Sequence, residues 1–160
     1  MKNQSKFKGK TGQTLVLTAP KGSNYRRIVL LGYGEASKLD KNSCETCGGK
    51  LYLALSGAGA EKVHFYLDDD QDREKITTRQ AAAHVALGIT LRAYKFDKYK
   101  TKKDEDSENG DLKQFTVITS AAGKAEDLYD TLDAQAQLLP GASEVGFLEL
   151  ELVGHGLPLR

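Results

Sequence analysis

The sequence lacks any long apolar run, and its 160 residues carry almost no net charge. A helix that crosses a membrane needs about 20 consecutive apolar residues, and no segment here approaches that length. The first residues, Met1 to Gln4, are polar and no apolar segment follows them, so they do not resemble a secretory signal. We therefore expect a soluble, cytoplasmic protein with no membrane partner.

Positively and negatively charged residues are also nearly equal in number. The formal net charge is +1 at pH 7, with 28% of the residues charged. A protein dedicated to nucleic acid needs a basic face for the phosphates, so nucleic acid is not an expected partner. The net charge does not exclude a local basic patch. A chain of this length suits one domain that buries roughly 70% of its unfolded surface and needs no disulfide or metal to fold.

Cysteine and histidine are scarce. The two cysteines, Cys44 and Cys47, have the spacing of a redox pair or of half a zinc site. A zinc site needs two further ligands, and the histidines stand apart from one another, at His64, His84 and His155. A thioredoxin-type pair usually has aromatic or proline neighbours, which are missing from Ser43–Gly49. We expect two packing residues near the start of a helix, with a redox or metal role as the alternative.

Other short motifs carry only part of a known chemistry. Gly32-x-Gly34 follows an apolar run and could cradle phosphate, but the third glycine of a dinucleotide fingerprint is absent and no helix follows directly, which favours a tight turn. Asp68–Asp70 could bind a divalent cation, but consecutive acids there are more typical of a solvated loop. His84 has no acid nearby in sequence, which favours a packed histidine. No Ser, Cys or Thr lies in a nucleophile motif, so we expect no catalytic residue. The possible metal-binding motifs are incomplete, so we expect no metal ligand.

Hydrophobic periodicity predicts strands that alternate with helices. Strands are expected at 14–18, 27–31, 63–67, 94–103 and 112–119, and helices at 43–58, 76–93 and 125–136. A turn at Pro20–Asn24 joins the first two strands as a hairpin, and Ser43 is expected to cap the first helix. Phe147–Val153 fits either a strand or a helix. This order predicts an α/β layer fold with helices on both faces of the sheet.

The run from Tyr94 to Lys103 alternates aromatic and charged residues as far as Tyr99, which indicates an edge strand with one wet face. Lysines recur along it and past its last aromatic residue, at Lys98, Lys100, Lys102 and Lys103. A solvated lysine tail guards a sheet edge against aggregation, and contact with an anionic partner is the alternative. Together with Gly32 and Gly34, these lysines are the candidate contacts for an anion or a partner.

Several segments resemble a known family when they are taken in order. They are FKGKTGQTLVL at 7–17, RIVLLGYG at 27–34, the glycine pair at 48–49, AAHVALG at 82–88 and YKFDKYKTKK at 94–103. Each is weak alone, but the ordered set is specific. Over about residues 6–137 the chain resembles the N-terminal domain of the leucyl aminopeptidases (cytosol aminopeptidases, peptidase family M17), in a form typical of alphaproteobacteria.

The resemblance implies a macro-domain-like mixed sheet between helices, without its opening strands, because family members carry several tens of residues before the position of Phe7. It also implies a hexameric parent enzyme. The larger C-terminal domain of that enzyme binds two divalent metals, such as zinc or manganese, and removes N-terminal residues from peptides. Motifs of that domain resembling N-T-D-A-E-G-R and V-T-F-D-S-G-G do not occur here. No catalytic or metal residue is therefore carried over, and no cofactor is expected in this chain.

We expect a flexible lead-in at 1–12, a macro-like domain at 13–138 and a divergent tail at 139–160. The expected function is that of a non-catalytic domain or fragment of a leucyl aminopeptidase, serving packing and assembly. Sheet edges exposed by the missing strands favour a homo-oligomer. The alternative function is a macro-like binding module for a nucleotide or nucleic acid.

Overall fold

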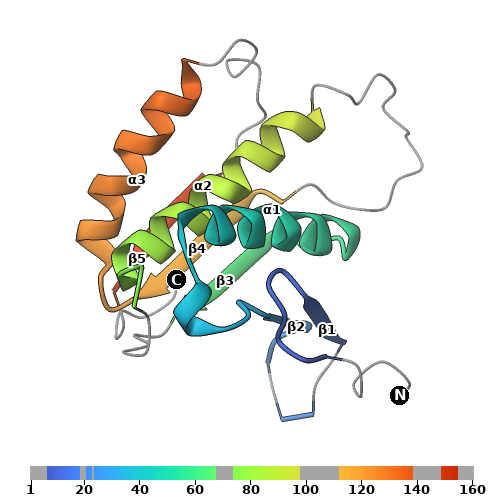
Figure 1. The fold of residues 1–160 in the computed structure, drawn as a ribbon. Coiled ribbons are helices and arrows are strands. Elements are labelled where there is room, and N and C mark those ends of the chain that lie inside the picture. The colour runs from blue at the N-terminus through green and yellow to red at the C-terminus, as the bar shows by residue number, and fades with distance from the viewer. Residues whose placement is uncertain are drawn as a thin grey trace.

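A computed structural model of the chain describes residues 7–18, 21–22, 24–67, 74–97, 112–138 and 149–154. Its elements follow one another as β1 (Thr14–Thr18), β2 (Arg27–Leu31), a short 3-10 helix (Ala36–Lys38), α1 (Lys41–Gly57), β3 (Lys62–Leu67), α2 (Thr78–Asp97), β4 (Gln114–Thr119), α3 (Ala122–Gln137) and β5 (Glu149–Val153) (Figure 1). No helix among these residues is long and apolar enough to span a membrane.

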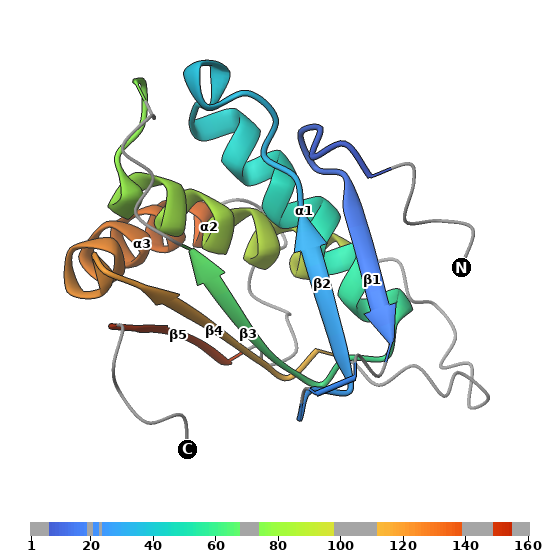
Figure 2. The same ribbon diagram turned by 90° about the horizontal axis from the view of Figure 1, so that it is seen from below.

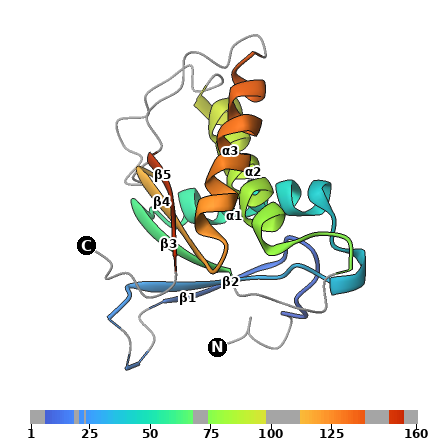
Figure 3. The same cartoon turned by 90° about the vertical axis from the view of Figure 1, so that its left-hand side faces the viewer.

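The strands form two separate ladders. β1 and β2 make the predicted antiparallel hairpin, and β3, β4 and β5 make a parallel sheet in that order. The α/β class predicted from the sequence is confirmed. In two views the three helices lie on the same side of β3–β5, whereas the sequence predicted helices on both faces of one mixed sheet (Figures 2 and 3). The hydroxyl oxygens of Tyr25, before β2, and Tyr66, on β3, lie 3.4 Å apart and link the two ladders.

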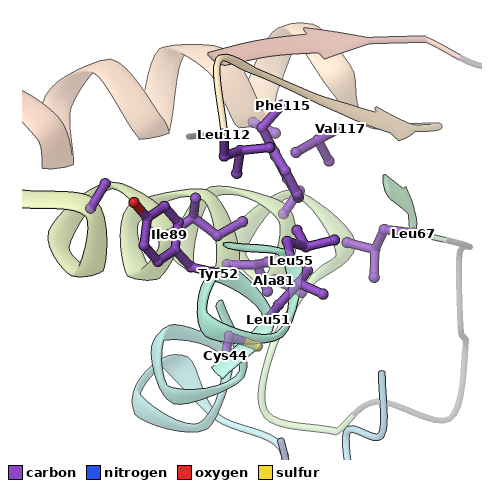
Figure 4. Close-up of a cluster of buried hydrophobic side chains, with 14 of the residues drawn as sticks. Cys44, Leu51, Tyr52, Leu55, Leu67, Ala81, Ile89, Leu112, Phe115 and Val117 are labelled. Atoms are coloured by element: carbon purple, nitrogen blue, oxygen red, sulfur yellow. The ribbon is translucent and has the colours of Figure 1, made fainter. Parts of the chain in front are cut away.

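The hydrophobic core lies between the parallel sheet and helices α1 and α2. Alternation along the strands sends Phe65 and Phe115 to the same face, where their rings stack with centroids 5.8 Å apart. Leu55 of α1 and Ile89 of α2 pack into the same cluster (Figure 4). Each large side chain buried here stabilises the fold by roughly 2 kcal/mol relative to an exposed one.

Helices α1 and α2 cross in close contact because each has a glycine at the crossing. A Cβ atom added to Gly48 would lie 2.2 Å from the carbonyl oxygen of Val85, and one added to Gly88 would lie 2.1 Å from that of Glu45. Both distances are far inside van der Waals contact, so neither position admits a side chain without separating the helices. Gly48, of the glycine pair noted in the sequence at 48–49, therefore has a packing role.

The start of α1 differs from the prediction by three residues. Asp40 is the N-cap, and its carboxylate accepts a 2.8 Å hydrogen bond from the backbone N–H of Ser43. Ser43, the predicted cap, is the donor of this bond and lies in the first turn. Aspartate is among the best caps because its carboxylate binds an otherwise unpaired N–H group. Hydrogen bonding from Ser43, first from its side chain and then from this backbone N–H, lowers the pKa of Asp40 below its ordinary value of 3.8.

The structure corrects the prediction of a strand at Tyr94–Lys103. The residues as far as Asp97 continue α2, and 98–103 lie outside the described residues. Extending an existing helix gains one backbone hydrogen bond for each residue that becomes fixed, and no glycine or proline interrupts 89–97. The β-propensity of aromatic residues depends on a neighbouring strand and is easily overridden.

Described residues on both sides of the predicted domain make backbone contacts with it. β5 falls within the predicted divergent tail and pairs with β4, with Leu152 opposite Val117. Within the segment that fitted either a strand or a helix, Glu149–Val153 is thus a strand. Gly9 and Gly12, within the predicted flexible lead-in, make backbone hydrogen bonds to the turn that follows β2.

Candidate functional site

The turn after β2, Gly32–Gly34, is built against the segment before β1. The N–H of Gly32 donates to the carbonyl oxygen of Gln13 at 2.8 Å, and the N–H of Gly34 donates to that of Gly9 at 2.8 Å. In the opposite direction, the N–H of Gly12 donates to the carbonyl oxygen of Gly32 at 2.7 Å. A phosphate cradle depends on free backbone N–H groups. Here both glycine N–H groups of the turn already have acceptors.

Glycine is needed at both positions, at Gly34 for its backbone conformation and at Gly32 for packing. Gly34 has a φ of 80°, a backbone conformation that residues with a side chain rarely adopt. At Gly32 an added Cβ would lie 2.4 Å from the backbone carbon of Gly9, so two stretches of main chain touch there. The motif that suggested a ligand turn is thus explained by the close approach of the two backbones.

Side chains of helix α1 contact this turn and the segment before β1. The Cys47 thiol points at the carbonyl oxygen of Gly32, 3.7 Å away, and the Lys50 ammonium nitrogen lies 3.5 Å from that of Thr11. Burial raises the pKa of the Cys47 thiol, and this effect outweighs a hydrogen bond from Gly12 and the charge of Lys50. A thiol kept protonated is a poor nucleophile and a poor metal ligand. Cys47 therefore acts as a packing group between α1 and the turn.

Lys50 is the residue of this region that the sequence reading missed. It is exposed and adds a positive charge beside the turn, one helical turn after Cys47. Its spacing of three residues from Cys47 puts both on one face of α1, which was the available signal. The four candidate lysines at 98, 100, 102 and 103 lie outside the described residues. Whether they join Gly32 and Gly34 in contacting an anion or a partner stays a prediction.

A second polar contact lies at the crossing of α1 and α2. His84 Nδ1 and Glu45 Oε1 are 2.7 Å apart, with the histidine side chain 7% exposed and the glutamate side chain 31% exposed. The prediction of a packed histidine is confirmed, but its acid partner is 39 residues away in sequence and was not foreseen. The pair satisfies a buried ring nitrogen and joins the two helices.

The described residues do not provide a donor set for a metal ion. In this part of the chain no three His, Cys, Asp or Glu side chains are close enough to bind one. Neither Cys44 nor Cys47 forms a disulfide, both are fully buried, and Cys44 belongs to the hydrophobic core, as packing residues would be. Asp68–Asp70, the other metal candidate from the sequence, lies outside the described residues.

Comparison with known proteins agrees with the segments noted in the sequence. A family model described as the cytosol aminopeptidase family, N-terminal domain, matches residues 1–103. The chain is 38% identical over 155 residues to a probable cytosol aminopeptidase of Chelativorans sp. (strain BNC1), covering 97% of this chain and 27% of that protein. It is 40% identical over 123 residues to one of Agrobacterium fabrum (76% and 24%) and 34% over 141 residues to one of Rhizobium etli (82% and 26%). The chain thus spans about a quarter of the length of these relatives.

Proposed function

Because the chain belongs to the cytosol aminopeptidase family through that family's N-terminal domain, we propose that these residues serve packing and assembly, without catalysis. One observation carries the proposal. The candidate groups that the structure describes, namely the Gly32–Gly34 turn, Cys47 and the His84–Glu45 pair, make contacts that hold its own elements together.

The contacts of these groups support a structural role. The glycine turn gives its N–H groups to the segment before β1, and Cys47 packs α1 against that turn. His84 and Glu45 hold α1 to α2. A catalytic acid, base or nucleophile must instead present its reactive atom to a substrate.

The activity of the relatives would then depend on residues outside this match. The resemblance implies two divalent metals for that reaction, and such a site needs several carboxylates that converge on the ions. The described residues do not fit that requirement. The proposal assigns peptide hydrolysis, and any metal, to the rest of the family's polypeptide. We also propose that the chain is located in the cytosol, because its relatives are named cytosol aminopeptidases.

The proposal is tested by assaying this chain for hydrolysis of a leucyl anilide with added manganese, fraction by fraction across a sizing column with light scattering. We expect no hydrolysis in the protein peak and a mass larger than one chain. Hydrolysis that follows the protein peak and is abolished by a chelator would overturn the non-catalytic assignment. A monomeric peak would overturn the assembly role.

A further inference from the structure

Strand β1 is an edge strand in the described part of the chain. It pairs with β2 on one side, and no other described strand pairs with it (Figure 2). Edge strands present unpaired backbone groups and are commonly protected by proline, charge or a bulge. β1 reads Thr-Leu-Val-Leu-Thr and has neither proline nor charge, and its central Val16 is 39% exposed.

The register of the hairpin shows which backbone groups of β1 face outward. The N–H of Gly32 donates to the carbonyl oxygen of Gln13, so the backbone of Gln13 faces β2. In antiparallel strands this direction alternates from residue to residue. The N–H and C=O groups of Leu15 and Leu17 therefore face β2, and those of Thr14, Val16 and Thr18 face the open side.

The sequence of β1 is the same in both directions around Val16. We propose that β1 pairs antiparallel with β1 of a second copy, with the two Val16 residues facing each other on a two-fold axis. Thr14 then lies opposite Thr18 of the other copy, and Leu15 opposite its Leu17. The outward-facing residues become the hydrogen-bonded pairs, and every cross-strand pair joins like side chains that pack well. A two-fold contact has this self-complementary form.

Strand β5, at the far side of the parallel sheet, is an outer strand that is less suited to such a contact. β5 reads Glu-Leu-Glu-Leu-Val, and a two-fold axis through its centre would bring Glu151 of each copy together. Like charges directly opposite each other destabilise a strand pair. The proposal rests on the assembly function given above and names the surface and the register that it uses.

The register is tested with two double variants of the 160-residue chain, Thr14→Lys/Thr18→Glu and Thr14→Glu/Thr18→Glu. Both put the same carboxylate opposite Arg27 and change the residue opposite Leu31, so their effects within one copy are matched. Across the proposed interface the first variant joins opposite charges twice, and the second joins like charges twice. Circular dichroism confirms that each variant is folded.

We expect the first variant to keep the dimer at twice 17.5 kDa and the second to raise the dimer dissociation constant about tenfold or more. Equal dissociation constants in an oligomeric protein would overturn the β1 contact and leave the assembly function standing. A monomeric unmodified chain would overturn both.

Cross-linking gives a second test of the same register. In Val16→Cys the two thiols would lie on the axis, where paired Cα atoms about 5.5 Å apart suit a disulfide. Leu53→Cys on α1 is the matched control, because Leu53 is 40% exposed. We expect oxidation to link Val16→Cys into a covalent dimer much faster than the control. Equal rates would contradict the proposal.

Discussion

His84 and Glu45, which are 39 residues apart in the sequence, lie 2.7 Å apart between His84 Nδ1 and Glu45 Oε1. The bond joins α2 to α1 beside the point where Gly88 touches the backbone of Glu45. Polar and steric contacts thus fix the same helix crossing.

A double-mutant cycle on His84→Ala and Glu45→Ala measures how much this contact contributes to the free energy of unfolding. We expect a coupling free energy of about 1 kcal/mol, the usual net value of a partly buried hydrogen bond. Urea unfolding of the four proteins gives the value. Additive effects of the two substitutions would show that the pair does not stabilise the crossing.

Replacing Gly88 with alanine should be among the most damaging small changes in α2. The added methyl group would collide with the Glu45 carbonyl oxygen, and relief requires the helices to move apart, at a cost of about 3 kcal/mol. Gly123→Ala in α3 is the control, because nothing lies within 4 Å of its added Cβ. The control should be neutral or slightly stabilising in thermal unfolding. Equal effects of the two substitutions would contradict the close crossing of α1 and α2.

Asp40 should make the stability of α1 depend on pH. Its pKa is lowered in the folded chain by hydrogen bonds from Ser43, mainly from the side chain and then from the backbone N–H, so the carboxylate stabilises the fold above its ordinary pKa of 3.8. This contribution is lost as the pH falls from 3.8 through the lower folded value. Asp40→Ala should therefore lower the melting temperature near neutral pH, and the difference should shrink in strong acid.

Asp40→Asn is the matched variant for this cap. Its amide oxygen can accept the same bond without titrating, so most of the neutral-pH stability should remain and its acid dependence should be weaker. A melting-temperature difference for Asp40→Ala that is the same at neutral and acid pH would remove the cap as its cause.

The cysteines should react only when the chain unfolds. Neither forms a disulfide and both are buried, and burial raises the pKa of the Cys47 thiol, so little of its reactive thiolate is present. A thiol reagent in mildly alkaline solution should modify neither cysteine in the native chain and both in denaturant. Mass spectrometry of Cys47→Ala identifies the signal of Cys44. Rapid native modification of Cys47 would reopen a redox or nucleophilic role.

Local sequence patterns were sufficient to predict a helix or strand where its formation depends mainly on its own residues. The hairpin, the strand at β3 and the helices α1 and α3 follow from alternation or helical spacing, within a few residues. The cap was misplaced because Asp40 and Ser43 are both good caps and only the backbone decides between them. The strand predicted at Tyr94 failed because an adjacent helix could extend further at little cost.

Contacts between distant segments could not be predicted from one sequence. Neither the pairing of Glu45 with His84 nor the touch of Gly32 on Gly9 leaves a local signal. The family resemblance was readable because it depends on the order of several short segments, and the match to the family's N-terminal domain confirms it. The glycine turn was noticed correctly as unusual, and the structure shows a packing cause for it.

Sedimentation equilibrium of the unmodified chain over a range of micromolar concentrations tests the assembly role most directly. We expect a mass above 17.5 kDa that rises with concentration toward at least twice that value. A single species of 17.5 kDa at every concentration would contradict it.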